Sequence, residues 1–124
     1  MKKYELTDET RTVEGKTLHR IRALRNFGNV REYDLGGFIE NEDNLSHDGD
    51  CWVYENAMVF GNAWISGNAQ ILSAAQISGN AIISRNTTIT GNAHISDHII
   101  ISGNAHISGE TTITGNAKII ENIR

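Results

Sequence analysis

The sequence predicts an all-β fold, a single-stranded parallel β-helix with an N-terminal β cap, and three regularities support this prediction. A branched aliphatic residue recurs at every sixth position from Val53 to Ile119, twelve times without a gap. A small or β-branched residue stands two positions before most of these aliphatic residues. A fixed short period is typical of a solenoid and outweighs the helix or strand preferences of single residues. The tripeptide Gly-Asn-Ala also recurs, beginning at Gly61, Gly67, Gly79, Gly91, Gly103 and Gly115.

The length predicts a single domain, residues 1–124. The spacing of the repeat divides it into four expected parts: an N-terminal cap at 1–35, an irregular first coil at 36–53, the regular β-helix at 54–120 and a tail at 121–124.

Within the expected cap, short strands are predicted at residues 4–7, 12–13 and 18–24, with a turn at Glu14 and Gly15. The cap should cover the open N-terminal end of the solenoid. Such cover is needed because a bare coil exposes both its apolar core and an unpaired backbone edge.

Each six-residue unit alternates inward and outward side chains, with Ala and Ile pointing inward, which predicts a strand of about four residues. The remaining two residues, mostly Gly-Asn, form a corner because both tolerate a positive φ. Coils stacked ~4.8 Å apart would pair their strands in parallel and place Ile on Ile. Each buried Ile stabilises the fold by roughly 1.5–3 kcal/mol.

The repeat allows a coil of either two or three six-residue units. Gly-Asn-Ala recurs at every second unit from Gly67, which favours two units. The outward residues favour a triangular coil of three units, because this coil gathers Trp64, Ile82 and Ile100 on one face. We therefore expect an 18-residue coil, whose three faces read Trp64, Ile82, Ile100, Lys118; Trp52, Gln70, Thr88, His106; and Met58, Gln76, His94, Thr112.

The net charge is −4, and most charged residues lie in the first 50 positions. Residues 51–124 carry three basic and four acidic side chains and are otherwise rich in Ser, Thr, Asn and Gln. No basic face of the kind that nucleic-acid binders carry is visible, and strong polyanion mimicry is not expected either. Cys51 is the one cysteine, which excludes an intramolecular disulfide, and its place in an Ala slot predicts a buried thiol.

No apolar run follows Met1, so neither a signal peptide nor a membrane-spanning segment is expected. The predicted location is cytoplasmic, with no membrane partner.

The unit x-Asn-Ala-x-Ile-x resembles the hexapeptide repeats of left-handed parallel β-helices over about residues 50–120. A second resemblance rests on the upstream segments Gly36-Gly37-Phe38-Ile39, Asn44-Leu45-Ser46, Gly49-Asp50-Cys51-Trp52-Val53-Tyr54 and Glu55-Asn56-Ala57-Met58. This part resembles the start of the YdcK-like hexapeptide proteins, bacterial and prophage proteins without an assigned biochemical role. The resemblance implies a left-handed coil, and proteins of this repeat type are often trimers. It permits a phage origin, which would place the protein in the host cytoplasm, and it implies no activity.

An outward apolar stripe is the first candidate site. Trp64, Ile82, Ile100 and Lys118 would lie on one face at successive coils, and contiguous exposed apolar surface usually marks an interface. We expect self-association or partner binding there. The alternative is that the N-terminal segment folds back over the stripe and covers Trp64 first.

The second candidate site is a partner surface on the cap and the first coils. Its alternatives are that the arginines pair with Glu32, Asp34 and Glu40, and that the aromatic residues simply pack against the cap. Arginine suits planar contacts to acidic or phosphate-bearing ligands, and exposed aromatic side chains often anchor a partner. The predicted residues are Arg20, Arg22, Arg25, Arg31, Trp52, Tyr54 and Phe60.

The histidines invite a catalytic or metal interpretation, which we weigh against solvated surface histidine. Hexapeptide acyltransferases use a catalytic histidine and normally a loop extruded between coils, yet no loop interrupts the repeat here. In the triangular coil His94 and His106 fall on different faces, and His98 lies at a corner. His47 with Asp48 and Asp50 forms a looser cluster in the irregular first coil. No cofactor and no metal site are expected.

Together these features predict a non-catalytic, oligomeric interaction protein, a trimer or dimer, that binds another protein through the cap and first coils. If the chain is phage-encoded, steric inhibition of a host defence protein would suit it. The alternatives are a minimal hexapeptide acyltransferase, a structural polymer-forming β-helix, and sequestration of a phosphorylated small molecule at a subunit seam.

Overall fold

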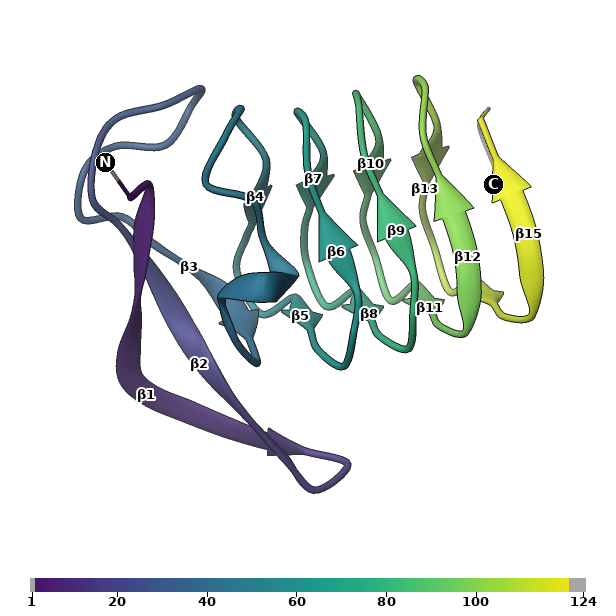
Figure 1. Ribbon diagram of the computed structural model, residues 1–124, viewed down its shortest axis with the longest axis horizontal. Coiled ribbons are helices and arrows are strands. Elements are labelled where there is room, and N and C mark those ends of the chain that lie inside the picture. Colours follow the sequence, from purple (N-terminus) through teal and green to yellow (C-terminus); the bar gives the residue numbers. More distant parts are fainter. Residues whose placement is uncertain (1, 121–124) are drawn as a thin grey trace.

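The computed structural model describes residues 2–120, which form a β-solenoid closed at its N-terminal end by a β-hairpin (Figure 1). Strands β1 (Tyr4–Val13) and β2 (Lys16–Ala23) pair antiparallel. Glu14 and Gly15 connect them with φ of 51° and 77°, the left-handed backbone that two-residue hairpin turns require. The turn was predicted correctly. The two separate strands expected before it are wrong, because β1 continues through a shift in register between Leu6 and Thr10.

Strand β3 (Leu35–Ile39) joins the cap to the solenoid. It pairs antiparallel with β2 and, on its other edge, parallel with β5 of the first regular coil. A short 3₁₀ turn, η1 (Glu42–Asn44), follows; the Asn41 side chain accepts from the backbone N–H of Asp43 at 2.8 Å and begins it. The cap therefore continues one sheet of the solenoid.

The coil is triangular, with three six-residue units per turn. Trp52 pairs with Gln70, and Trp64 pairs with Ile82, so each strand lies parallel to the strand three units further along the chain. Three sheets result, in the orders β1-β2-β3-β5-β8-β11-β14, β13-β10-β7-β4 and β15-β12-β9-β6. The strands are β4 (Trp52–Val53), β5 (Met58–Val59), β6 (Trp64–Ile65), β7 (Gln70–Ile71), β8 (Gln76–Ile77), β9 (Ile82–Ile83), β10 (Thr88–Ile89), β11 (His94–Ile95), β12 (His98–Ile101), β13 (His106–Ile107), β14 (Thr112–Ile113) and β15 (Asn116–Ile119).

The solenoid is left-handed. In Figure 1 the strands β6, β9, β12 and β15 lie in front and run upward, β7, β10 and β13 lie behind them, and successive coils advance to the right toward the C-terminus. A chain that rises in front, descends behind and advances to the right makes a left-handed coil.

The core is a narrow column of the inward aliphatic and small residues, which are almost all fully buried from Val53 to Ile107. Most strands have two residues, although the alternation predicted about four. The reason is that the inward Ala belongs to the corner: the Ala57 amide donates to the Tyr54 carbonyl at 3.0 Å, and the Ala63 amide donates to that of Phe60 at 3.4 Å. The five successive corners from Tyr54 to Ala81 are thus hydrogen-bonded four-residue turns.

Candidate functional site

The cap covers one face of the solenoid from outside. Leu18 of β2, Phe38 of β3, and Met58 and Phe60 of the first regular coil form a second apolar cluster beneath the hairpin. The outward positions of this face are therefore buried at the N-terminal end. Because the hairpin lies over this face, it leaves the face formed by β6, β9, β12 and β15, here called the open face, uncovered.

The open face carries the apolar stripe, which we define as Trp64, Ile82 and Ile100. These side chains are 38%, 40% and 39% exposed, although each is paired in register with its neighbour on the next coil. The N-terminal segment leaves Trp64 exposed, contrary to the alternative considered from the sequence. Lys118 continues the row, since it pairs with Ile100. A contiguous apolar row on a flat sheet has the character of an interface.

Of the three aromatic residues proposed for partner binding, two are buried by the cap. Trp52 is 1% exposed and packs edge-on against Phe27 at 5.2 Å between ring centroids, while Phe60 is 2% exposed. Tyr54 is half-buried, and burial raises the pKa of its hydroxyl. It lines a groove of 540 Å³ that also contains Gly28 and Asn29 of the cap loop. Only Tyr54 among these three presents surface to a partner.

The cap arginines have mainly structural contacts. Arg20 is largely buried; it donates to the Gly36 carbonyl at 2.6 Å, pairs with Glu9 at 3.0 Å, and lies over the Phe38 ring. Arg22 pairs with Glu5. The expected pairing with Glu32, Asp34 and Glu40 is wrong for these two residues, because β1 lies beside β2 and supplies the carboxylates.

The other two arginines differ from each other. Arg25 donates to the His47 carbonyl at 3.2 Å and lies 5.7 Å from the centre of the Phe27 ring. Arg31 is exposed, and its backbone amide donates to Asp34 at 2.9 Å. Of the four arginines predicted for partner binding, Arg22 and Arg31 are therefore the exposed ones.

Sequence reasoning missed two exposed apolar residues of the cap. Tyr33 is 68% exposed and Leu35 57% exposed, and Leu35 pairs across the sheet with Arg22. Tyr33 has a φ of 76°, a conformation that a bulky residue rarely adopts. No repeat covers this segment, so no pattern singled these residues out. Arg22, Tyr33 and Leu35 form what we call the cap patch.

A buried lysine closes the N-terminal end of the solenoid. Lys3 is fully buried, and its Nζ donates to the carbonyl oxygens of Cys51 at 2.7 Å and Gly49 at 3.3 Å. Burial lowers the pKa of Lys3 and raises the pKa of the Cys51 thiol, 3.4 Å from that Nζ. Cys51 is buried, as its place in the repeat predicts. The contacts satisfy carbonyl groups of the irregular first coil, which is a structural role.

The His47 ring connects this end to η1. It stacks on Tyr4 with centroids 4.2 Å apart, and its Nδ1 accepts from the Lys3 amide at 3.1 Å. That contact leaves Nε2 to donate to Glu42 Oε1 at 2.7 Å. Hydrogen bonds from His47 and Lys2 lower the pKa of Glu42. His47 thus pairs with Glu42, and the expected cluster with Asp48 is absent from the contacts of the described residues.

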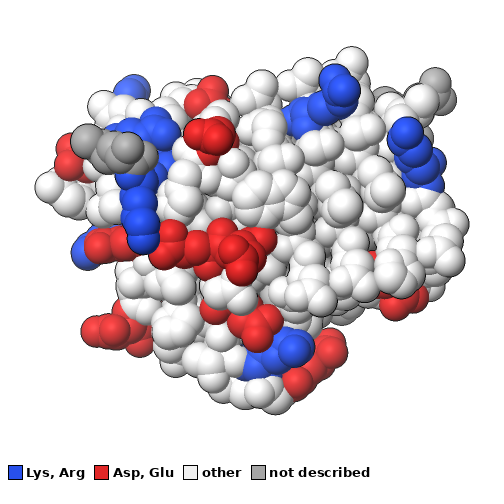
Figure 2. Space-filling view, viewed as in Figure 1, with Lys and Arg blue, Asp and Glu red and all other residues white. Residues whose placement is uncertain are grey.

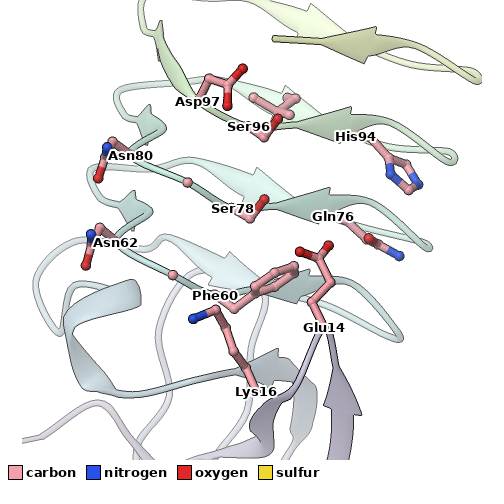
Figure 3. A pocket seen from close by; sticks show the side chains of 13 residues that line it. Glu14, Lys16, Phe60, Asn62, Gln76, Ser78, Asn80, His94, Ser96 and Asp97 are labelled. Carbon is pink, nitrogen blue, oxygen red and sulfur yellow. The ribbon is translucent and has the colours of Figure 1, made fainter. Parts of the chain in front are cut away.

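A polar cleft of 530 Å³ lies between the hairpin tip and the face of β5, β8 and β11. Figure 3 shows Glu14 and Lys16 reaching from the hairpin toward the coils, with His94 at one side. The ladder of outward side chains in it comes from successive coils, because Gln76 pairs in register with His94 on the next coil. The lining residues include Gln76, Ser78, Asn80, Ser96 and Asp97.

The histidines do not converge. His94 lies on β11, His106 on β13, and His98 begins β12, so each belongs to a different sheet. His98 therefore stands in a strand, where a corner was expected. Within residues 2–120, no three His, Cys, Asp or Glu side chains come close enough to bind a metal ion. The same part of the chain contains no helix long and apolar enough to cross a membrane.

Comparison with known proteins supports the assignment of the repeat. Residues 75–91 match the family model of the YdcK β-solenoid repeat. The chain is also similar to the uncharacterized acetyltransferase YdcK of Escherichia coli (strain K12), with 35% identity over 69 residues. This similarity covers 48% of the present chain and 21% of the relative, so the chain spans about a fifth of that relative's length.

Proposed function

We propose that this YdcK-like β-helix repeat protein is a non-catalytic interaction module. It associates with itself through the apolar stripe and binds a macromolecular partner through its cap. The observation that carries this proposal is the exposure of Trp64, Ile82 and Ile100, about two-fifths each, on the open face, which the hairpin does not cover. Burying these side chains against another molecule would remove apolar area from water at about 25 cal/mol per Å².

The test of self-association is the solution mass by light scattering on a sizing column at micromolar concentration. We expect a defined oligomer that dissociates in the Ile82→Asp variant, because a carboxylate at the centre of an apolar contact loses its hydration without a partner. His106→Asp is the matched control, since it changes the same register position on another face. A wild-type monomer, or equal behaviour of the two variants, would contradict the proposal.

The cap patch is the surface we propose for the second partner. It combines the exposed Tyr33 and Leu35 with Arg22, and aromatic residues and arginine are the residue types that most often dominate binding energy. A pull-down should recover the same protein reproducibly with wild type and with Ile82→Asp, but not with the Tyr33→Ser/Leu35→Ser double variant. Retention by that double variant would count against the cap patch. Steric inhibition of a host protein is one form such binding could take.

Acyl transfer is the second candidate function, and two observations favour it. The relative is named as an acetyltransferase, and His94 lines a polar cleft large enough for a small acceptor. An active enzyme should show a rise in Tm with millimolar coenzyme A and acetyl transfer that His94→Ala abolishes while His106→Ala does not. No thermal shift in wild type would exclude this candidate.

A further inference from the structure

We propose that the occupant of the apolar stripe is a second copy of this chain lying antiparallel to the first, about a twofold axis at Ile82. This inference rests on the proposed self-association and adds its geometry. The argument comes from the charges at the two ends of the open face.

The N-terminal end of the open face is acidic. The turn η1 lies beside β6, and the Leu45 backbone pairs with Ile65, so η1 stands one coil before Trp64. The turn contributes Glu42 and Asp43, of which Glu42 is paired with Lys2 at 3.0 Å. Asp43 is exposed and has no ion-pair partner among the described residues. Figure 2 shows a run of acidic side chains over this end, with basic side chains of the cap beside it.

The C-terminal end of the open face is basic. Lys118 of β15 is exposed one coil beyond Ile100. Between η1 and β15 the outward residues of the strands are Trp64, Ile82, Ile100 and, at the start of β12, His98; none of them is an Asp, Glu, Lys or Arg. Figure 2, which views the molecule from this side, shows mostly uncharged surface between the red end over the cap and the blue side chain at the far right, with a second blue side chain at the upper edge of this surface.

Ile82 is the midpoint of this charge pattern. The turn η1 lies two coils before Ile82 and Lys118 two coils after it, about 10 Å away in each direction at the usual strand spacing. An antiparallel twofold at Ile82 places Lys118 of each copy over η1 of the other. Trp64 then faces Ile100 of the second copy, so aromatic and aliphatic groups pack together.

In a parallel arrangement, whether a twofold dimer or a threefold trimer, each coil of one copy lies beside the same coil of the next copy. Lys118 would then lie near Lys118, and the acidic turns would lie near each other. Like charges at an interface are unfavourable. In an isologous antiparallel dimer, Lys118 of each copy instead lies near the acidic turn of the other, which gives two contacts between opposite charges. The charge pattern therefore selects the antiparallel dimer.

Disulfide trapping tests the orientation. Ser66 and Ser102 follow the inward residues of β6 and β12, on the same edge of the stripe. We expect Ser66→Cys copies mixed with Ser102→Cys copies to form a mixed disulfide dimer on mild oxidation. A parallel assembly would instead trap Ser66→Cys with Asn62→Cys, on the opposite edge of the same coil, and that result would overturn the inference. Wild type is the background control, because its Cys51 is buried.

Exchanging the charges of Lys118 and Asp43 provides a second test of the orientation. Lys118→Glu should raise the dissociation constant of the dimer about five- to tenfold. The reason is that a carboxylate then faces the acidic turn η1 of the other copy at both symmetry-related contacts, where Lys118 had faced it. Adding Asp43→Lys should restore the wild-type dissociation constant. Lys16→Glu, an equal change of charge on the hairpin tip, should leave it unchanged. If Asp43→Lys gives no rescue, the antiparallel pairing is wrong.

The two proposals fail in different ways. A monomeric wild type removes self-association and the orientation with it. An oligomer that Ile82→Asp dissociates, but that traps Ser66→Cys with Asn62→Cys, retains the stripe as the interface and removes only the antiparallel arrangement.

Discussion

The residue that opens each corner of the coil adopts a left-handed backbone, and the space beside it differs from corner to corner. Gly79 has a φ of 65°, and a Cβ built there would lie 2.5 Å from the backbone N of Asp97 on the next coil. Gly109 has a φ of 76°, and a Cβ there would meet nothing within 4 Å. Asp97 itself holds a φ of 63° as a side-chain-bearing residue. A side chain thus tolerates the left-handed backbone, and the room beside the residue is what differs between the Gly79 and Gly109 corners.

This difference predicts unequal costs for the same substitution. Gly109→Ala should lower the free energy of unfolding by about 1 kcal/mol, the cost of a positive φ for alanine. Gly79→Ala should lower it by roughly 2–4 kcal/mol, because the two coils must also separate. Urea denaturation at equilibrium measures both values. Equal losses would show that coil contact contributes nothing beyond the backbone conformation.

The charge of Glu42 makes the stability of the folded protein depend on pH in the acid range. Its pKa is lowered in the folded state by hydrogen bonds from His47 and Lys2, so the folded protein holds the carboxylate more strongly than the unfolded chain does. The contribution to stability is therefore present above the ordinary glutamate pKa of about 4.3 and is lost as pH falls through the lowered value.

The variant Glu42→Gln should accordingly have a lower Tm than wild type at neutral pH. The gap should close as the pH falls below about 4. Thermal unfolding followed by circular dichroism across this range measures the gap. Glu110→Gln, at an exposed carboxylate, is the control and should show no such gap. A gap independent of pH would contradict the role of the Glu42 charge.

At the scale of elements, the β1–β2 hairpin is held to the solenoid at two places: Tyr4, Ile21 and Ala23 lie in the main core, and Leu18 lies in the second apolar cluster. Leu18 is fully buried in the cluster with Phe38, Met58 and Phe60. Leu18→Ala should therefore cost about 2–5 kcal/mol and release the hairpin before the coils. Hydrogen exchange should show the loss of protection in β1 and β2 first, whereas Thr17→Ala, exposed on the same strand, should leave protection unchanged.

The elements also show how far the sequence could predict the structure. The triangular coil, its three faces and the apolar stripe followed from the repeat, because every unit makes the same local contacts. The position of the hairpin did not, since it depends on contacts between segments that share no period. Trp52 and Phe60 are outward in the repeat frame yet buried beneath the cap, and Arg20 meets Glu9 rather than the acidic residues downstream.

The same limit applies to the candidate site. The stripe could be named from spacing alone, but its exposure depended on which face the hairpin covers. Tyr33 and Leu35 could not be found, because a single tyrosine and leucine in a non-repeating segment are as consistent with a core as with a surface. The cleft at Glu14 and His94 joins residues that lie far apart in the chain, so no sequence pattern predicts it.

At the scale of the whole molecule, the six-residue repeat specifies the fold and the three-unit coil specifies the surface. Deleting residues 79–96 removes one complete coil and leaves Ile100 below Trp64. Deleting residues 79–90 keeps every inward aliphatic residue in phase, yet it rotates the downstream coils by one face and places His94 below Trp64.

Both deletions should therefore fold, because the inward pattern is retained. Light scattering should show self-association retained after the three-unit deletion and lost after the two-unit deletion. Circular dichroism should report β structure in both. Self-association in both deletion variants would mean that the stripe is not the interface.

The registers of the coil also determine the order in which the chain can fold. From β7 onward each strand pairs with the strand three units earlier, and β3 meets β5 through the pairs Phe38 with Met58 and Ile39 with Val59. During synthesis, the first template is complete once Val59 has left the ribosome, and each later coil finds its partner already formed. No segment has to wait for a distant C-terminal strand, so the nascent chain exposes only the most recent edge at any moment.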